Sequence, residues 1–163
     1  MVRLAIADNP AFRVSTIEID REGRSYTVDT LRALRATLPA RTALTLLIGV
    51  DAFRELDTWK EYAALFRLAD LAVWSRPPDS IRAPRALLPV AAQREFCYGR
   101  LQNTLRHRTG NRIRFLTVTA LDVSASAIRL RLRRGYSVRY LVPASVGRYV
   151  SRHGLYGWRR GAS

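Results

Sequence analysis

One short segment, a strand followed directly by a helix, constrains the fold of this chain most strongly. Residues 113–118 combine Ile, Phe, Leu and Val in the pattern of a buried strand. Ser124 is a favoured N-cap residue, and it precedes a helix predicted over residues 125–134 that Gly135 ends. A strand that leads into a helix in this way is typical of α/β folds, in which helix N-termini meet the carboxyl edge of a sheet.

The start of that helix is a candidate anion site. Its first backbone N–H groups carry the positive end of the helix dipole, and Ser124 and Ser126 add two hydroxyl groups. Arg129 lies three residues after Ser126, so the two side chains share a helix face. A guanidinium and two hydroxyls at a helix start suit phosphate. The alternative is that Ser124 only caps the helix and that Arg129 is one more solvated arginine.

Two further apolar segments predict parallel strands with polar residues at their ends. Residues 44–50 form a nearly continuous apolar run, as expected for a strand covered on both faces, and Gly49 and Asp51 stand at its end. Residues 71–74 form a shorter strand, and Arg76 follows it. Open α/β sheets bind ligands at the carboxyl ends of such strands. Capping of the next helix is the alternative role of Asp51.

The rest of the chain reads as alternating strand and helix. Ser25 or Thr27 is the expected cap of a helix that Pro39 ends. The other elements predicted are helices over residues 2–6, 55–69, 95–107 and 144–153 and a strand over residues 12–19. No internal repeat or linker divides the chain. We therefore expect one domain over residues 1–163, built as an open, mostly parallel sheet with helices on both faces.

The positive net charge of the chain bears on the class of its binding partner. The formal net charge is +15, and a strongly basic chain suggests nucleic acid or an anionic surface as partner. Lys60 is the only lysine among 28 basic residues, however, and the arginines are spread along the chain and do not form one block. A sequence-wide bias toward arginine explains this distribution as well as a nucleic-acid partner does, and it would also suit a ligand with several phosphates. The hydrophobic content of 48% is sufficient for a real core.

The cysteine count and the apolar runs indicate the compartment. Cys97 is the only cysteine, which excludes an internal disulfide and fits a reducing environment. No apolar run approaches the roughly 18 residues of a membrane span, and the first residues lack the length of a signal-peptide core. We therefore expect a cytoplasmic protein without a membrane partner.

Six motifs occur in this sequence in an order that resembles a known family. They are Ser25-Tyr-Thr-Val-Asp-Thr-Leu31, Leu47-Ile-Gly-Val-Asp-Ala-Phe53, Thr58-Trp59, Ser75-Arg76-Pro77, Asp122-Val-Ser-Ala-Ser-Ala-Ile-Arg129, and Arg139-Tyr-Leu-Val-Pro143 with His153-Gly-Leu-Tyr156. Together they resemble bacterial nicotinate mononucleotide adenylyltransferase, the nucleotidyltransferase that makes deamido-NAD from ATP and nicotinate mononucleotide. The resemblance extends over nearly the whole chain.

The resemblance implies an ATP site. In the family a Ser-x-Thr-x-x-Arg turn holds the ATP phosphates, and this role falls to Ser124, Ser126 and Arg129. Ser126 replaces the usual Thr and keeps its hydroxyl. Gly49 and Asp51 correspond to positions beside the nucleotide, with Gly49 allowing close backbone approach and Asp51 facing ribose hydroxyls. Mg²⁺ is implied as a companion of the ATP phosphates, and no protein ligand for a metal is identified.

The resemblance also implies a mononucleotide site. Tyr26 and Thr27 fall where the family places the nicotinate ring, with backbone N–H groups at a helix start receiving its carboxylate. Trp59 falls where an indole packs on that ring. Ordinary packing between helix and sheet is the alternative for Tyr26 and Trp59. Arg76 is a candidate for the phosphate of the mononucleotide.

The sequence departs from the family pattern at its beginning. Family members open with a Gly-rich strand end and His-x-Gly-His, whose imidazoles stabilise charge on the transferred phosphoryl group, and this chain contains no such motif. His107 and His153 have neither the spacing nor the preceding strand, and His153 is more simply a cation at a helix end. Met1 corresponds to an internal position of the family. We therefore expect an N-terminally incomplete Rossmann-like domain, with no catalytic residue identified, that is inactive and poorly stable alone.

The function expected from the resemblance is adenylyl transfer from ATP to nicotinate mononucleotide, with small-molecule substrates as partners. A basic nucleic-acid-binding protein is the competing class. It requires strong, salt-sensitive binding to random duplex and arginines gathered on one face. A non-catalytic remnant that binds the mononucleotide is a third possibility. The sequence does not determine the oligomeric state.

Overall fold

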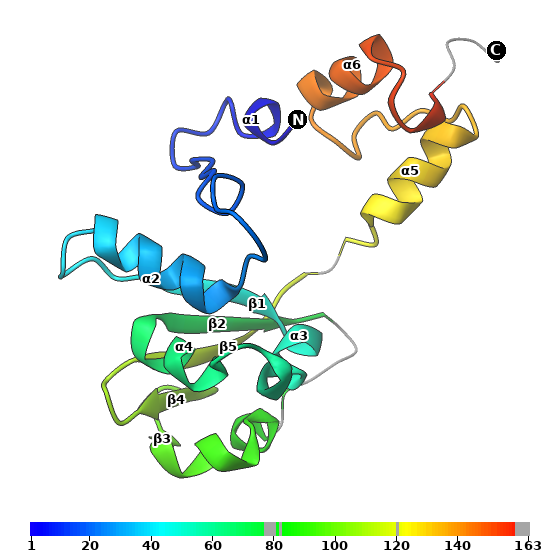
Figure 1. Ribbon diagram of the computed structural model, residues 1–163. Helices are drawn as coiled ribbons and strands as arrows, with labels where there is room; N and C mark the ends of the chain where they lie inside the picture. The colour runs from blue at the N-terminus through cyan, green and yellow to red at the C-terminus, as the bar shows by residue number, and fades with distance from the viewer. Residues whose placement is uncertain (77–80, 82, 120, 159–163) are drawn as a thin grey trace. The chain divides into compact units, whose positions relative to one another are not determined.

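The structure is a computed structural model that describes residues 1–76, 81, 83–119 and 121–158 (Figure 1). It divides into two compact units. Unit 1 comprises residues 1–16 and 121–163, and unit 2 comprises residues 17–120. The expectation that residues 1–163 form a single domain, incomplete at its N-terminus, stays a prediction.

Unit 2 contains a five-stranded sheet. Its strands are β1 (Thr45–Gly49), β2 (Asp70–Ser75), β3 (Phe96–Tyr98), β4 (Thr104–His107) and β5 (Arg112–Thr117). They lie in the order β1-β2-β5-β4-β3. The pairs β1–β2 and β2–β5 are parallel, whereas β4 runs antiparallel to both β5 and β3. Four of the five strands thus point the same way, which confirms the open, mostly parallel sheet.

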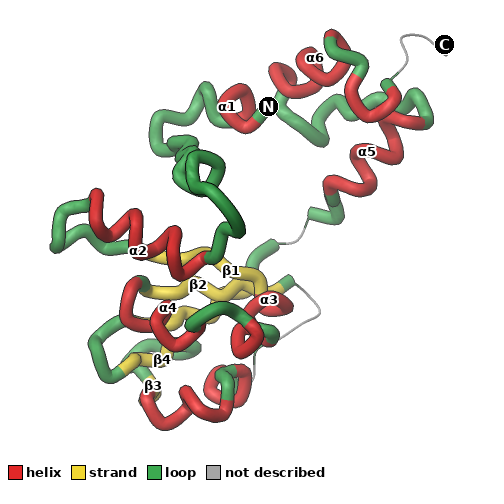
Figure 2. Tube along the Cα trace, viewed as in Figure 1, coloured by secondary structure: helices red, strands yellow, loops and turns green. Residues whose placement is uncertain are grey.

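The helices of unit 2 cover one face of this sheet. They are α2 (Thr27–Thr37), α3 (Val50–Arg54) and α4 (Tyr62–Leu68), and the 3₁₀ segment η1 (Leu56–Thr58) connects α3 to α4. Two more 3₁₀ segments, η2 (Pro84–Leu87) and η3 (Val90–Glu95), lie between β2 and β3. Figure 2 shows α2, α3 and α4 together on one side of the strands. Because side chains alternate along a strand, Ile48, Val73 and Phe115 face these helices and are buried with Phe53 and Leu65 of the helical layer.

The opposite face of the sheet is open within unit 2, and this corrects one expectation. Residues 44–50 were predicted to be covered on both faces, yet Leu47 is 73% exposed and Leu116 of β5 is 47% exposed. β1 is an edge strand, and among the described residues no strand pairs with its outer side. An apolar run therefore indicated a strand correctly without showing that both faces are covered.

Unit 1 has a small core of its own. It contains α1 (Val2–Ala5), α5 (Ala125–Arg133), α6 (Ala144–Arg152) and the 3₁₀ segment η4 (Leu155–Gly157). Leu132, Val138 and Val150 form its buried centre. The hydroxyl of Ser145 donates a hydrogen bond to the carbonyl of Leu4 at 2.9 Å, which ties α1 to α6.

Two predicted elements differ in the structure. No strand forms over residues 12–19, where Phe12 and Ile19 are exposed, because an alternating pattern gives a strand only when a neighbour completes the hydrogen-bond ladder. The helix predicted over residues 55–69 is broken into η1 and α4 by Glu61, whose φ of 47° is left-handed. The break places Trp59 and Lys60 in the connection between the two.

The helix predicted over residues 95–107 is wrong. This segment ends η3 and then forms the hairpin β3–β4, in which Phe96 pairs with His107. Gly99 and Asn103 flank the turn, and Asn103 adopts a left-handed φ of 55°. A Cβ on Gly99 would approach the side chain of Thr104 to 2.9 Å, so only glycine fits this turn. Gly99 and Asn103 were the turn signals that the helical interpretation missed.

Candidate functional site

The predicted mononucleotide residues line one pocket at the beginning of α2. This pocket has a volume of about 280 Å³ and is lined by Ser25, Tyr26, Thr27, Val28, Thr58, Trp59 and Lys60. Tyr26 and Thr27 come from the start of α2, and Trp59 comes from the end of η1. The structure therefore brings together three of the residues that the sequence singled out for nicotinate, although they are more than thirty positions apart.

The start of α2 lacks the cap that the sequence predicted. Tyr26 is the N-cap residue, and no side chain among the described residues caps this helix end. Thr27 is instead the first helical residue, and the hydroxyl of Ser25 donates to the carbonyl of Glu18 at 3.2 Å. Because the first N–H groups of a helix have no partner within the helix, they remain available to an acceptor in this pocket.

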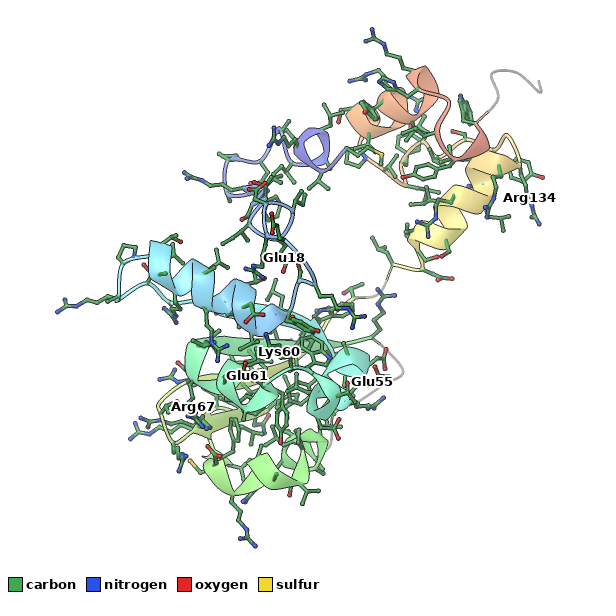
Figure 3. The ribbon with its side chains drawn as sticks, in the orientation of Figure 1. Glu18, Glu55, Lys60, Glu61, Arg67 and Arg134 are labelled. Carbon is green, nitrogen blue, oxygen red and sulfur yellow. The ribbon has the colours of Figure 1, made fainter. Side chains whose placement is uncertain are left out.

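Lys60 is a functional candidate that the sequence analysis missed. Its Nζ atom lies 4.8 Å from the centroid of the Tyr26 ring and 2.9 Å from Oδ2 of Asp29 (Figure 3). The ammonium group is thus held at the mouth of an aromatic pocket by a carboxylate on α2. Its being the only lysine in a chain rich in arginine was the one signal that could have drawn attention to it.

The charges around this pocket keep the carboxyl group of Asp29 ionised. The hydrogen bond from Lys60 is the main cause that holds the pKa of Asp29 below its usual value, and it outweighs the desolvation that raises it. The charges of Lys60, Arg21 and Arg32 act in the same direction. Asp29 therefore stays ionised at neutral pH and keeps Lys60 in place.

A second ion pair, between Arg32 and Glu61, joins α2 to the residue that precedes α4. Arg32 of α2 donates from both terminal nitrogens to the two carboxylate oxygens of Glu61, with Nη1 3.2 Å from Oε1. This bond is the largest cause that lowers the pKa of Glu61, and it raises the pKa of Arg32. Glu61 and Lys60 are labelled side by side beneath α2 in Figure 3. A two-pronged contact at this point restrains the chain that carries Trp59.

The ends of β1 and β2 form a second group of candidate residues. Gly49 pairs in register with Trp74, and a Cβ on Gly49 would meet that indole at 3.5 Å. The guanidinium of Arg76 lies over the Trp74 ring, 5.1 Å from its centroid. Asp51 is exposed in the first turn of α3 and pairs with Arg54 at 3.5 Å. Pro77, which follows in the motif, lies outside the described residues.

Ser75 at the end of β2 is another residue whose chemistry the sequence analysis did not single out. Its side chain is buried, and its hydroxyl has no hydrogen-bond partner within the described part of the chain. A buried polar group without a partner is uncommon in proteins. It adjoins Arg76, the candidate for the mononucleotide phosphate.

The predicted phosphate residues are assembled at the start of α5 in unit 1. The hydroxyl of Ser124 accepts a hydrogen bond from the N–H of Ala127 at 3.1 Å, which confirms it as the N-cap. Arg129 donates from Nη2 to the hydroxyl of Ser126 at 3.4 Å, and both side chains are exposed. The guanidinium and the two hydroxyls therefore lie at one helix end, as the spacing predicted.

The two histidines have structural surroundings. The buried ring of His107 receives the backbone N–H of Thr109 on Nδ1 at 3.3 Å, so Nε2 carries the proton and donates to Glu95 at 2.9 Å. The ring of His153, the C-cap residue of α6, lies against Tyr149 at 4.3 Å between centroids. Neither lies in a pocket described above.

Within the described residues, no three His, Cys, Asp or Glu side chains gather closely enough to hold a metal ion. None of the described helices is long and apolar enough to cross a bilayer. The candidate sites described above consist of arginine, lysine, the carboxylate of Asp51, hydroxyl groups, aromatic rings and helix N-termini.

The sheet is open and mostly parallel, one helix start without a side-chain cap adjoins an aromatic pocket, and another helix start carries hydroxyl groups and an arginine. These features are those of a nucleotide-binding α/β protein. Comparison with known proteins identifies the family. The chain is 44% identical over 156 residues to a probable nicotinate-nucleotide adenylyltransferase of Geotalea uraniireducens. The aligned residues make up 96% of this chain and 72% of that relative. The identity is 45% for the protein of the same name in Syntrophotalea carbinolica and 46% for that in Trichlorobacter lovleyi. The chain belongs to the nicotinate-nucleotide adenylyltransferase family, a family of nucleotidyltransferases.

Solved structures agree on the fold. The Plasmodium falciparum nicotinic acid mononucleotide adenylyltransferase complexed with APC superposes with a TM-score of 0.57 at 13% identity. It covers 85% of this chain, and the chain spans 61% of it. The same enzyme complexed with NaAD gives a TM-score of 0.56. No protein-family model matches the sequence.

Proposed function

We propose that this chain serves adenylyl transfer from ATP to nicotinate mononucleotide, giving deamido-NAD and pyrophosphate. Identity of 44–46% to relatives named for this activity supports the proposal. The observation that carries it is the pocket at the start of α2, where Tyr26, Thr27 and Trp59 meet. This pocket offers a flat aromatic surface and free helix N–H groups to a flat ring that bears a carboxylate.

In this proposal the pocket in unit 2 holds the nicotinate ring. Trp59 and Tyr26 supply aromatic contacts, and the N–H groups at Thr27 receive the carboxylate. Lys60 adds a positive charge at the mouth of the pocket, which favours the acid over the amide form of the mononucleotide. Arg76, whose guanidinium lies over the Trp74 ring, is the candidate for the mononucleotide phosphate.

The ATP side of the reaction is proposed for two groups of residues. Ser124, Ser126 and Arg129 bind phosphate oxygens at the start of α5. Asp51, together with the backbone at Gly49, lies at the end of β1, where a ribose would be bound. Mg²⁺ enters with the ATP phosphates as part of the substrate.

The reaction needs no protein nucleophile. The phosphate of the mononucleotide attacks the α-phosphorus of ATP in line, and pyrophosphate leaves. The protein positions both substrates and offsets the charge that develops on the transferred group, a role that falls to Arg129 among the described cations. Because the chain contains no His-x-Gly-His motif, we expect turnover by the 163-residue chain at least on the order of 10² below that of a relative that has it.

Calorimetry with the full chain tests the proposal. Nicotinate mononucleotide is titrated first, then the amide mononucleotide, and deamido-NAD formation is followed with Mg²⁺–ATP present. We expect saturable binding of the acid form and weaker binding of the amide. Binding of both substrates without any product would identify a mononucleotide-binding protein that does not catalyse transfer. Absence of mononucleotide binding, or equal affinity for acid and amide, would contradict the proposed pocket.

A further inference from the structure

A second pocket opens on the sheet of unit 2, and its lining includes none of the residues assigned to either substrate. It has a volume of about 520 Å³ and lies over the strands β3, β4 and β5. Its lining consists of Cys97, Tyr98, Gly99, Arg100, Leu101, Thr104, Arg106, Arg112 and Arg114. A volume of this size is typical of small-molecule sites. Four of the nine lining residues are arginines.

In the described part of the chain, the guanidinium groups of these four arginines, Arg100, Arg106, Arg112 and Arg114, form no ion pair or hydrogen bond. Arg106 of β4 pairs directly across the ladder with Arg112 of β5, and Arg114 follows two residues later on the same face. Like charges placed opposite each other on neighbouring strands repel and destabilise a sheet. By contrast, Arg32 pairs with Glu61, Arg54 with Asp51 and Arg108 with Glu95. This pocket therefore holds an excess of positive charge that an anionic ligand would relieve.

Among the described residues, no carboxylate lines this pocket. The nearest acid in the sheet, Asp70 of β2, uses its Oδ1 atom to accept the backbone N–H of Arg112 at 2.8 Å and lines a different pocket. Its charge is thus already engaged by the backbone. The arginine side chains of the pocket are exposed and free to turn toward a ligand.

The floor of the pocket is rigid. The N–H of Gly99 donates to the carbonyl of Thr104 at 2.8 Å, and the space beside Gly99 is too small for a side chain. The carbonyl of Asn103 accepts the N–H of Phe115 at 2.8 Å, which fastens the turn to β5. Because the hairpin is fixed in this way, the arginines project from preformed backbone, which lowers the entropic cost of binding.

We propose that this pocket is a binding site for a compact anion with two or three linked phosphates, such as inorganic pyrophosphate or tripolyphosphate or the phosphate chain of a nucleotide. Several guanidinium groups in one pocket match several adjacent phosphates, and each offers paired donors. A nucleic-acid strand is less well matched, because Tyr98 is the one aromatic side chain among the described lining residues, whereas single strands are bound by several rings on which successive bases stack. The proposal does not depend on adenylyl transfer.

Calorimetric titration of the full chain with inorganic tripolyphosphate at about 0.15 M salt tests the site. We expect saturable binding that the double variant Arg112→Gln/Arg114→Gln weakens at least about tenfold. The matched control is Arg41→Gln/Arg94→Gln, which removes the same charge from exposed arginines outside the pocket and should change affinity less than about twofold. Arg100→Gln/Arg106→Gln serves as a second pocket variant.

Cys97 provides an independent reporter. It is the only cysteine of the chain, it is exposed, and it lines the pocket. Alkylation by iodoacetamide, a neutral reagent, should slow when tripolyphosphate is bound. The protection should persist in Arg129→Gln, because the start of α5 is a separate phosphate site, and should be lost in Arg112→Gln/Arg114→Gln.

Three results would overturn the proposal. The first is the absence of saturable tripolyphosphate binding, and the second is an equal loss of affinity in the control and the pocket variants, which would show a diffuse charge effect. The third is tighter binding of a single-stranded oligonucleotide than of tripolyphosphate with the same Cys97 protection, which would make this face a nucleic-acid surface. Nicotinate mononucleotide binding is measured in parallel and should be unchanged in the pocket variants, so that either proposal can fail alone.

Discussion

Trp59 and Lys60 are neighbours in the sequence, and both line the pocket at the start of α2. This helix begins at Thr27, more than thirty residues earlier in the chain. The break at Glu61 makes this possible, because a continuous helix would turn successive side chains about 100° apart around its axis. The connection between η1 and α4 thus contributes two of the residues that line the proposed mononucleotide pocket.

Trp59→Ala should weaken nicotinate mononucleotide binding about tenfold and leave ATP binding within about twofold. The reason is the loss of one aromatic face of the pocket, and stacking and burial together account for an effect of this size. Calorimetry with each ligand separately measures the difference. Trp59→Phe should recover most of the affinity. Equal losses for both ligands would show that Trp59 supports the fold and does not contact the ring.

Arg129→Ala should raise the ATP concentration needed for half-saturation about tenfold, because a charge-assisted contact to the polyphosphate is lost. Arg129→Lys should recover only part of the loss, since an ammonium cannot form the two-pronged contact. Arg152→Ala, which removes an exposed arginine from α6, is the matched control. ATP titrations of the three variants give the comparison, and an unchanged value in Arg129→Ala would exclude the phosphate role.

Glu95→Gln should make the chain less stable at pH 7 and have a smaller effect in acid. The hydrogen bond from His107 is the main cause that lowers the pKa of Glu95 below its ordinary value of 4.5. A lowered carboxylate pKa contributes stability that is present above the unfolded value and disappears as the pH falls through the folded one.

Melting temperatures at pH 7 and near pH 3 check this prediction. The gap between wild type and Glu95→Gln should narrow as the pH drops below 4.5. Glu22→Gln, which alters an exposed carboxylate, should show no such gap. A constant gap at all pH values would mean that the variant acts through packing alone.

At the scale of elements, the β3–β4 hairpin depends on Gly99. Gly99→Ala should destabilise the chain by about 1–3 kcal/mol, because its Cβ would come within 2.9 Å of Thr104 in a turn that cannot widen freely. Gly147→Ala in α6 is the control, since its Cβ would meet only Val142 at 3.8 Å and alanine favours helix. Denaturant unfolding of both variants gives the comparison, and equal stabilities would argue against the tight turn.

Among the described residues, no strand pairs with the outer side of β1, and Leu47 of this edge strand is exposed. Such an edge is a template for pairing with another chain. Leu47→Lys should therefore raise the temperature at which light scattering begins, without changing the circular dichroism spectrum.

Val90→Lys is the matched control for the edge, because Val90 is 84% exposed, against 73% for Leu47, but lies in η3 and not on a strand edge. It should leave the onset of scattering almost unchanged. If both variants delayed aggregation to the same degree, the added charge and not the strand edge would be responsible.

The sequence determined the elements whose signals are local. Residues 125–134 were predicted as a helix because Ser124 caps it and Gly135 follows, and the structure places α5 there. The pairing of Ser126 with Arg129 in the candidate phosphate site follows from their spacing of three residues within one helix. The strands β2 and β5 and the helix α6 were marked in the same way by apolar runs and by Pro and Gly.

Strand pairing and contacts between residues far apart in the sequence became known only from the tertiary structure. Residues 12–19 form no strand and residues 96–107 form a hairpin, because pairing is settled by what lies alongside and not by the alternation itself. The same holds for Lys60, whose proximity to Tyr26 requires α2 and α4 to pack together. The arginine pocket over β3, β4 and β5 likewise arises from strand register, which brings Arg106 opposite Arg112 and which no spacing along the chain encodes.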